Sequence, residues 1–186
     1  MNKQEFSRIF LCGFMGTGKT TLGKLLAYKL GKPFVDMDDL IKTKARLSIP
    51  QIFQLYGEAH FRKLEKDAIQ EAAAEQQGVI ALGGGALQDI ELVQTIKSNG
   101  LLVFIDSPFE VLLSRLMRNK KRPMLLDNEG KMKDKESLRH ELSELYNKRL
   151  PMYRQAHITF SSGQNIKAYE QAELLKEHIC TYEQDT

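Results

Sequence analysis

Residues 13–20 read Gly-Phe-Met-Gly-Thr-Gly-Lys-Thr, a glycine-rich run that ends in a cationic and a hydroxyl side chain. Glycines let a backbone curl until several N–H groups converge on phosphate oxygens, and a helix that starts here adds the positive end of its dipole. Lys19 would neutralise phosphate oxygens, and the Thr20 hydroxyl would bind Mg²⁺, which bridges the phosphates. A glycine turn alone explains the glycines but not Lys19 and Thr20 at these offsets. This Walker A spacing predicts that a nucleotide contacts Gly13, Met15, Gly16, Thr17, Gly18, Lys19, Thr20 and Thr21.

A second group of polar residues, Asp36-Met-Asp-Asp39, ends a short apolar run. Acidic residues at such a position commonly cap the next helix. Two carboxylates at alternate positions could instead divide the work of phosphoryl transfer, one ordering magnesium waters and the other accepting a hydroxyl proton. The residues alone leave both interpretations of Asp36 and Asp38 open.

Three consecutive glycines and two arginines complete the candidate residues. A flexible turn explains Gly83 to Gly85, but three glycines in a row also permit unusually close approach of a small ligand. Arg62, next to Phe61, and Arg149, near Pro151, would form surface salt bridges by default. A planar guanidinium group is also the best single match to a carboxylate, so both arginines are candidates for binding an acidic substrate.

Short apolar runs that alternate with longer segments of helical period must position these residues. The pattern is typical of an α/β fold, a parallel sheet covered by helices. We expect strands at residues 8–13, 33–36, 78–82, 101–106 and 157–160. We expect helices at residues 19–30, 39–46, 49–56, 58–76, 90–98, 109–117, 135–153 and 166–181. In the fourth helix the apolar face consists of Phe61, Leu64, Ala68, Ile69 and Ala72. Open α/β sheets bind ligands at the carboxyl ends of their strands, where the glycine and carboxylate motifs lie.

Length and composition bound the class of protein. The 186 residues favour a single domain over 1–186, and 42% hydrophobic with 27% charged residues is ordinary globular composition. The longest apolar run, Leu101 to Ile105, is far below the roughly 18 residues that a membrane span needs. The first residues also do not fit a secretory signal, so we expect a cytoplasmic protein with no membrane partner. Cys12 and Cys180 lie at opposite ends of the chain and are expected to be free thiols.

Positive charge is concentrated in residues 115–135, which hold eight basic and three acidic residues. Such a stretch is usually a solvated face, yet its confinement to one segment suggests an anionic partner. Nucleotide phosphate and nucleic acid both fit, although the segment has no interleaved aromatic residues on which bases could stack. Residues 119–133 lack a clean period and contain Pro123 and Gly130, which predicts a mobile loop.

Six motifs in one order give a specific resemblance. They are Gly13 to Thr21 (GFMGTGKTT), Phe34 to Asp38 (FVDMD), Gly57 to Arg62 (GEAHFR), Gly83 to Ala86 (GGGA), Arg122-Pro123 and Arg149 to Tyr153 (RLPMY). Their order and spacing resemble those of the shikimate kinases over nearly the whole chain. Any P-loop kinase could share one motif, whereas the six together are specific to this family.

The resemblance implies a nucleoside-monophosphate-kinase-like fold with strand order 2-3-1-4-5. It implies Mg²⁺-dependent transfer of the γ-phosphoryl group of ATP to the 3-hydroxyl of shikimate, which gives 3-phosphoshikimate on the route to chorismate and aromatic amino acids. Asp38 would contact the substrate hydroxyls and act as base, while Asp36, through water, and Thr20 would hold the magnesium. The residues implied for substrate binding are Asp38, Arg62, Gly83, Gly84, Gly85 and Arg149, with the two arginines on the carboxylate.

The same resemblance implies roles for further residues of the nucleotide side. Lys19 and Arg122 would stabilise charge on the transferring group, Arg115 would stack on adenine, and residues 161–165 would complete the adenine pocket. Substrate-binding helices are implied at about residues 37–62 and a lid at about residues 116–135, in a segment between Arg122 and Arg149 that is longer than usual for the family. The expected partners are ATP, ADP and shikimate, with no nucleic acid, and the chain is expected to be a monomer.

Two alternative functions remain. Gluconate also combines one carboxylate with hydroxyls, so a gluconate kinase of the same fold fits some of the same residues. The motifs from Asp36 through Arg62 to the triple glycine favour shikimate. A non-catalytic nucleotide switch or nucleic-acid binder would instead use the basic residues of 115–135.

Overall fold

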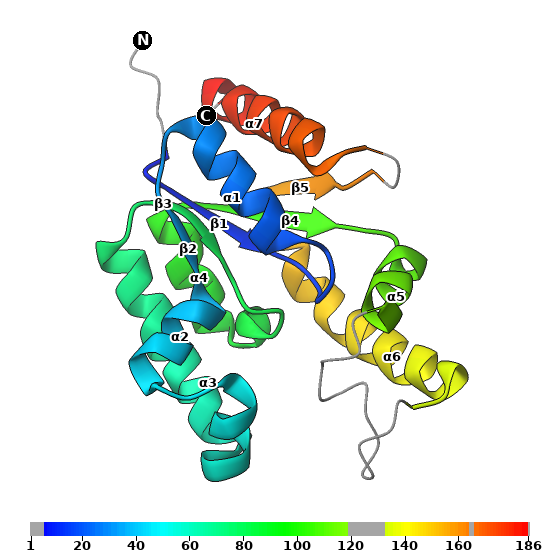
Figure 1. Ribbon diagram of the computed structural model, residues 1–186. Helices are drawn as coiled ribbons and strands as arrows, with labels where there is room; N and C mark the ends of the chain where they lie inside the picture. Colours follow the sequence, from blue (N-terminus) through cyan, green and yellow to red (C-terminus); the bar gives the residue numbers. More distant parts are fainter. Residues whose placement is uncertain (1–5, 119–132, 164–165, 186) are drawn as a thin grey trace.

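A five-stranded parallel sheet forms the centre of the protein (Figure 1). The computed structural model describes residues 6–118, 133–163 and 166–185. The strands are β1 (Arg8–Cys12), β2 (Phe34–Asp36), β3 (Gly78–Ala81), β4 (Leu101–Asp106) and β5 (Ile158–Ser161), in the order β2-β3-β1-β4-β5. Every neighbouring pair is parallel, so the predicted fold class and strand order are confirmed.

The strand bounds agree with the sequence prediction to within one residue, and β5 shows why they are not identical. We predicted that this strand begins at His157, but it begins at Ile158. The backbone N–H of Leu102 donates to Nδ1 of His157 at 3.0 Å, so an imidazole takes the place of a backbone acceptor at the end of the ladder. A side chain that substitutes for the backbone leaves no sign in the hydrophobic pattern.

Helices connect and cover the strands (Figure 1). They are α1 (Lys19–Leu30), α2 (Met37–Ala45), α3 (Ile49–Glu75), the 3₁₀ helix η1 (Ala86–Gln88), α4 (Ile90–Asn99), α5 (Phe109–Arg118), α6 (Lys135–Tyr153) and α7 (Ala168–Asp185). Helix α2 begins at Met37 rather than Asp39 because the Asp36 carboxylate caps it. Helix α7 begins later than predicted because the Gln171 side chain binds the carbonyls of Gly163 and Ile166 and holds the preceding segment outside the helix. Within the described ranges, no helix has the length and apolarity needed to cross a membrane.

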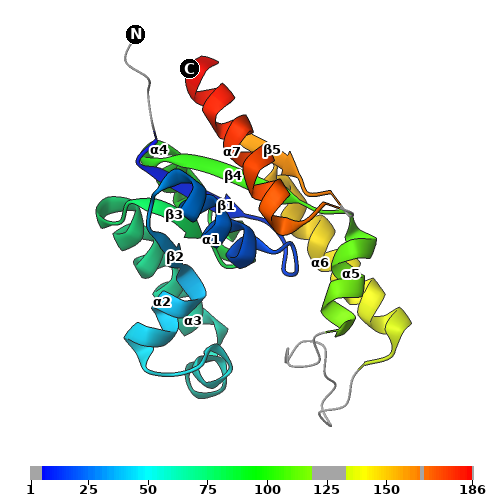
Figure 2. The same ribbon diagram turned by 45° about the horizontal axis from the view of Figure 1, so that its top comes forward.

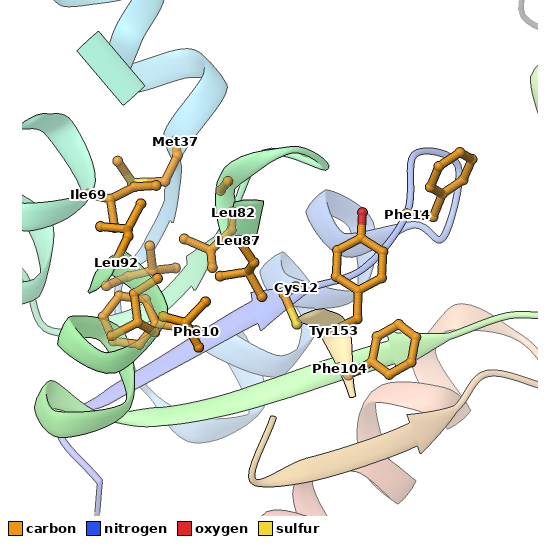
Figure 3. Close-up of a cluster of buried hydrophobic side chains, with 14 of the residues drawn as sticks. Phe10, Cys12, Phe14, Met37, Ile69, Leu82, Leu87, Leu92, Phe104 and Tyr153 are labelled. Carbon is orange, nitrogen blue, oxygen red and sulfur yellow. The ribbon is translucent and has the colours of Figure 1, made fainter. Parts of the chain in front are cut away.

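Alternating side chains of the buried strands build two apolar layers, one on each face of the sheet. Ile9 and Leu11 of β1 pack with α1 and α7, whereas Phe10 and Cys12 pack with the helices of the opposite face. Figure 2 shows α1 and α7 side by side over the sheet, and Figure 3 shows part of the opposite layer. Burial raises the pKa of the Cys12 thiol to about 12, and both cysteines are free, as predicted.

The register of the strands brings three motifs to one edge of the sheet. Leu11 of β1 and Asp36 of β2 both pair with Ala81 of β3, so the three strands end at the same level. The residues that follow them therefore emerge side by side at the carboxyl edge, the place where parallel sheets bind ligands. These residues are the loop from Gly13, the first turn of α2 and the glycine run from Gly83.

Candidate active site

The glycine-rich run forms a compact loop between β1 and α1. Gly13 has a φ of 142°, and a Cβ atom there would lie 2.6 Å from the carbonyl oxygen of Ile105, so only glycine fits. The Lys19 ammonium donates to the carbonyls of Gly13 and Phe14 at 2.9 and 3.1 Å, and the Thr17 hydroxyl donates to Phe14 at 2.9 Å. The first N–H groups of α1 point into the loop from the helix N-terminus. This arrangement suits the binding of phosphate.

Thr20 and Asp36 meet at the start of α1. The Thr20 hydroxyl donates to Oδ2 of Asp36 at 2.7 Å, and Oδ1 of the same carboxylate accepts the N–H of Asp38 at 3.0 Å. Asp36 therefore caps α2 with one oxygen and reaches the phosphate loop with the other. The interpretation of Asp36 as a helix cap is confirmed. Its role toward magnesium stays a prediction, and the oxygen that contacts Thr20 is the one available for it.

A cavity of about 620 Å³ opens beside the phosphate loop. Its volume is in the ordinary range for small-molecule sites. Its polar lining comes from Asp38, Arg62, Glu65, Arg149 and the run Gly83 to Gly85, and Met15 of the loop also contributes. All six residues that we predicted for substrate binding thus lie around one cavity. Their roles in binding stay predictions.

Both halves of α3 line this cavity because the helix bends at Gly57, whose φ of 79° and ψ of 175° are not helical. The predicted helices 49–56 and 58–76 correspond to these halves. Phe53 before the bend packs on Phe61 after it, with 4.7 Å between ring centroids. Together with Ile49 and Pro50 they form an apolar wall. The substrate-binding helices implied at about residues 37–62 include these four residues, but the sequence analysis did not name them as site residues, because apolar residues in a helix are expected in the core.

The sequence analysis also missed Glu65, which contacts Arg62. Nη1 of Arg62 donates to Oε2 of Glu65 at 2.6 Å, and the opposite side of the guanidinium binds the exposed Glu58. Burial raises the pKa of Glu65, Arg62 acts against this rise, and Asp38 adds to it. Glu65 is buried on the apolar face of α3, four residues after Phe61. A carboxylate on an apolar helix face is the sequence signal that could have found it.

Arg149 and Tyr153, in the last turn of α6, both contact the glycine run. Nη1 of Arg149 donates to the carbonyl of Gly84 at 3.1 Å, and the hydroxyl of Tyr153 donates to the same carbonyl. The Nε atom of Arg149 is buried and has no hydrogen-bond partner among the described residues. A ligand oxygen that reached this donor would remove the cost of leaving it unpaired.

The cations predicted around the nucleotide fall partly within the described residues. Arg115 on α5 donates from Nη1 to the carbonyl of Gly16 at 3.2 Å, so its guanidinium lies against the phosphate loop. Thr21 is exposed on α1. Arg122 and most of the lid predicted at 116–135 lie outside the described residues, as do residues 164–165 of the predicted adenine pocket.

Known proteins are similar to this chain in sequence and fold. The sequence profile of the family described as "Shikimate kinase" matches residues 15–180. A shikimate kinase of Salinibacter ruber is 37% identical over 161 residues, which cover 86% of this chain and 79% of that protein. A solved structure of the shikimate kinase from Acinetobacter baumannii in complex with shikimate has a TM-score of 0.85 at 34% identity and covers 96% of this chain and 95% of its own. A gluconokinase from Sinorhizobium meliloti, at 16% identity and a TM-score of 0.60, shares the fold alone.

The parallel sheet, the phosphate loop and the neighbouring cavity define the class of P-loop kinases that act on small molecules. The profile match spans most of the chain, and the relatives agree with it in identity and coverage. The chain belongs to the shikimate kinase family, whose members are ATP-dependent kinases. The resemblance that the six motifs indicated is thereby confirmed.

Proposed function

We propose that this chain transfers the γ-phosphoryl group of ATP to the 3-hydroxyl of shikimate, with Mg²⁺, and releases 3-phosphoshikimate and ADP. The observation that carries the proposal is that the phosphate loop and the cavity share a wall, because Met15 of the loop lines the cavity together with Asp38 and Arg149. Shikimate is a ring with one carboxylate and three hydroxyls. Its site needs cations for the carboxylate and an acceptor for the hydroxyls, and the cavity has both.

The two arginines of the cavity are assigned to the shikimate carboxylate. A guanidinium group binds a carboxylate through two parallel hydrogen bonds, which fixes orientation as well as charge. Glu65 holds Arg62 through Nη1 and so limits the directions in which the guanidinium points. The apolar wall that includes Phe53 and Phe61 would pack against the face of the ring. These contacts would orient the 3-hydroxyl toward the phosphate loop.

Asp38 is assigned to the hydroxyl that accepts the phosphoryl group. It lies in the first turn of α2 and lines the cavity together with Arg62 and Arg149. An ionised Asp38 would hold the hydroxyl in line with the phosphate and take its proton as the new bond forms. In a loose transition state the proton leaves late, so orientation is the larger part of this role.

Charged groups are assigned to the phosphates of the nucleotide. Thr20 and Asp36 offer a hydroxyl and a carboxylate oxygen 2.7 Å apart, and such oxygen ligands suit Mg²⁺, which would be held by Thr20 directly and by Asp36 through water. When bound, the ion neutralises phosphate charge. Lys19 would stabilise the negative charge on the transferring group, and Arg115 would contact the adenine. Arg122 is proposed to act with Lys19.

The test of the proposed function is ADP release by the purified full chain with Mg-ATP and one acceptor at a time, namely shikimate, quinate, gluconate or a nucleoside monophosphate. Shikimate should accelerate ADP release and the others should not. Acceleration by gluconate alone would make the chain a gluconate kinase. Salt-dependent binding of single-stranded nucleic acid, without any acceptor-dependent ADP release, would favour the nucleic-acid binder.

Two neighbouring carboxylates on α2 give a matched pair of variants. Asp38→Asn keeps the shape of the side chain but removes the proton acceptor, so turnover should fall by roughly 10² or more if general-base help is important, and by less if Asp38 chiefly orients the hydroxyl. Asp39→Asn should leave turnover unchanged, because the Asp39 side chain is 64% exposed and pairs with Lys42. Equal turnover of both variants, with normal shikimate binding, would remove Asp38 from the mechanism.

A further inference from the structure

The carbonyl of Gly84 has two donors from the same helix turn. Tyr153 and Arg149 are four residues apart on α6 and therefore share a face, and both donate to this oxygen. The Tyr153 ring is 1% exposed and stacks on Phe104 with 5.3 Å between centroids. Figure 3 shows the ring beside Phe104 with its hydroxyl directed away from that side chain. Because the ring is held in place, its hydroxyl cannot easily reach another hydrogen-bond partner.

We propose that Tyr153 is a positioning residue, whose hydroxyl fixes the Gly84 peptide and thereby holds Arg149 in the orientation that binds the carboxylate of the acceptor. The inference rests on the proposed function, because it takes the acceptor carboxylate to be the ligand of Arg149. Tyr153 does not line the described cavity, so it acts through Arg149 and not by contact with the acceptor.

The position of Gly84 explains why such a fixing contact matters. A glycine peptide rotates more freely than any other, and Gly84 stands in the middle of three glycines. A Cβ atom at Gly84 would lie 3.5 Å from the amide nitrogen of Met15 and 3.8 Å from Nη1 of Arg149, so its backbone sits between the phosphate loop and the arginine. Rotation of this peptide would move the acceptor of the Arg149 hydrogen bond. Burial raises the pKa of Tyr153, so its hydroxyl remains a neutral donor throughout the working pH range.

Tyr153→Phe removes the hydroxyl and keeps the buried ring. The Gly84 carbonyl retains Arg149 as a donor, so it is not left unsatisfied and the fold should persist. Loss of one hydrogen bond should raise the KM for shikimate about 3- to 10-fold, while kcat and the Kd for ADP stay within about 2-fold. A purely structural role would lower the amount of folded enzyme and hence the apparent kcat, but would not change the KM.

Tyr146→Phe is the matched control. Tyr146 is also on α6 and also loses one hydroxyl contact, with Oδ1 of Asp106 at 3.3 Å, whereas the side-chain donors to the Gly84 carbonyl are Arg149 and Tyr153. The KM of the Tyr146→Phe variant for shikimate should match that of the wild type. Thermal unfolding of each variant sets the assay temperature well below every Tm, so that lost stability does not enter the comparison.

A double-mutant cycle with Arg149→Met tests whether Tyr153 acts through Arg149. The assay is ADP release against shikimate concentration at saturating Mg-ATP, with ADP affinity measured by calorimetry. In the Arg149→Met background, Tyr153→Phe should not raise the KM further. An unchanged KM in the single variant, an equal rise in both backgrounds, or a parallel loss of ADP affinity would each overturn the inference. Lack of shikimate-dependent ADP release by the wild type would instead overturn the proposed function.

Discussion

Replacing Arg62 by methionine should destabilise the protein in a way that depends on pH. The change removes the partner of Glu65, whose side chain is only 4% exposed, and leaves a buried carboxylate unpaired. Breaking a fully buried ion pair costs about 3 to 5 kcal/mol. Because the Arg62 side chain is 30% exposed and water screens its charge, we expect about 2 to 3 kcal/mol. For a chain of this size, that corresponds to a Tm lower by about 4 to 12 °C at neutral pH.

The pH dependence follows from the direction of the Glu65 shift. Burial raises the pKa of Glu65 above its ordinary value of 4.5, so the folded state binds a proton that the unfolded state has already lost. The contribution of Glu65 to the free energy of unfolding is therefore largest below its ordinary pKa of 4.5 and is lost as the pH rises through the pKa of the folded state. Without Arg62 the pKa rises further, so the loss of stability relative to wild type should be larger at about pH 8 than at about pH 5.

Differential scanning calorimetry of three variants checks this reasoning. Lys66→Met is the control, because Lys66 is also on α3 but the side chains of its partners Asp89 and Glu91 are 37% and 80% exposed. The Tm of this variant should change by no more than about 3 °C. Glu65→Gln in the Arg62→Met background should remove the pH-dependent part of the loss. The reasoning is refuted if Arg62→Met loses as much stability at low pH as at high pH, or no more than Lys66→Met does.

Three further changes test the site and the sheet. Lys19→Ala should lower kcat by roughly 10² to 10³ without weakening shikimate binding, and a folded variant with wild-type turnover at saturating ATP would exclude Lys19 from charge stabilisation. Gly83→Ala should raise the KM for shikimate at least about 10-fold and leave the affinity for ADP unchanged. The new methyl group would lie 2.6 Å from Oε1 of Glu65 and 3.2 Å from Oδ1 of Asp38 and would displace these side chains. An unchanged KM would mean that the acceptor binds elsewhere. Burial lowers the pKa of His157 in the folded state below its ordinary value of 6.5. The stability that the neutral His157 contributes is therefore present above pH 6.5 and is lost as the pH falls through the pKa of the folded state. His157→Asn keeps an acceptor for Leu102 without titrating, so its Tm should fall less on acidification than that of the wild type, and equal falls in Tm would contradict this role.

The features predicted well from the sequence are those fixed by local chemistry. The bounds of α1 and α6 agree with the prediction; Gly31 in the left-handed conformation ends α1, and the Asp134 carboxylate caps the start of α6. The parallel register then requires Asp36, Gly13 and Gly83 to emerge at one edge. The gathering of these motifs at the cavity therefore follows from the order of strands and helices along the chain.

The features that the sequence did not predict depend on contacts between distant segments. Tyr153 and Gly84 are 69 residues apart, and no periodic pattern joins them. Glu65 was overlooked because its apolar neighbour Leu64 fits the helical period and is therefore expected to face the core. In the structure Glu65 is the more buried of the two. In both cases a polar group has a partner that only the folded chain supplies.

The two apolar layers of the enzyme differ in how far their residues can be substituted when the substrate changes. Helices α1 and α7 cover one face of the sheet, and the start of α1 reaches the site through Thr20, which contacts Asp36. Apart from Met15 of the phosphate loop, the residues around the cavity come from α2, α3, α6 and the glycine run, which belong to the opposite layer. Under the proposed function, substitutions on α2, α3 and α6 would alter which acceptor fits, while Lys19 and Thr20 at the start of α1 would stay in place. A change of substrate in such an enzyme would therefore remodel the cavity side of one layer, whereas the packing of α1 and α7 against the other face could be kept.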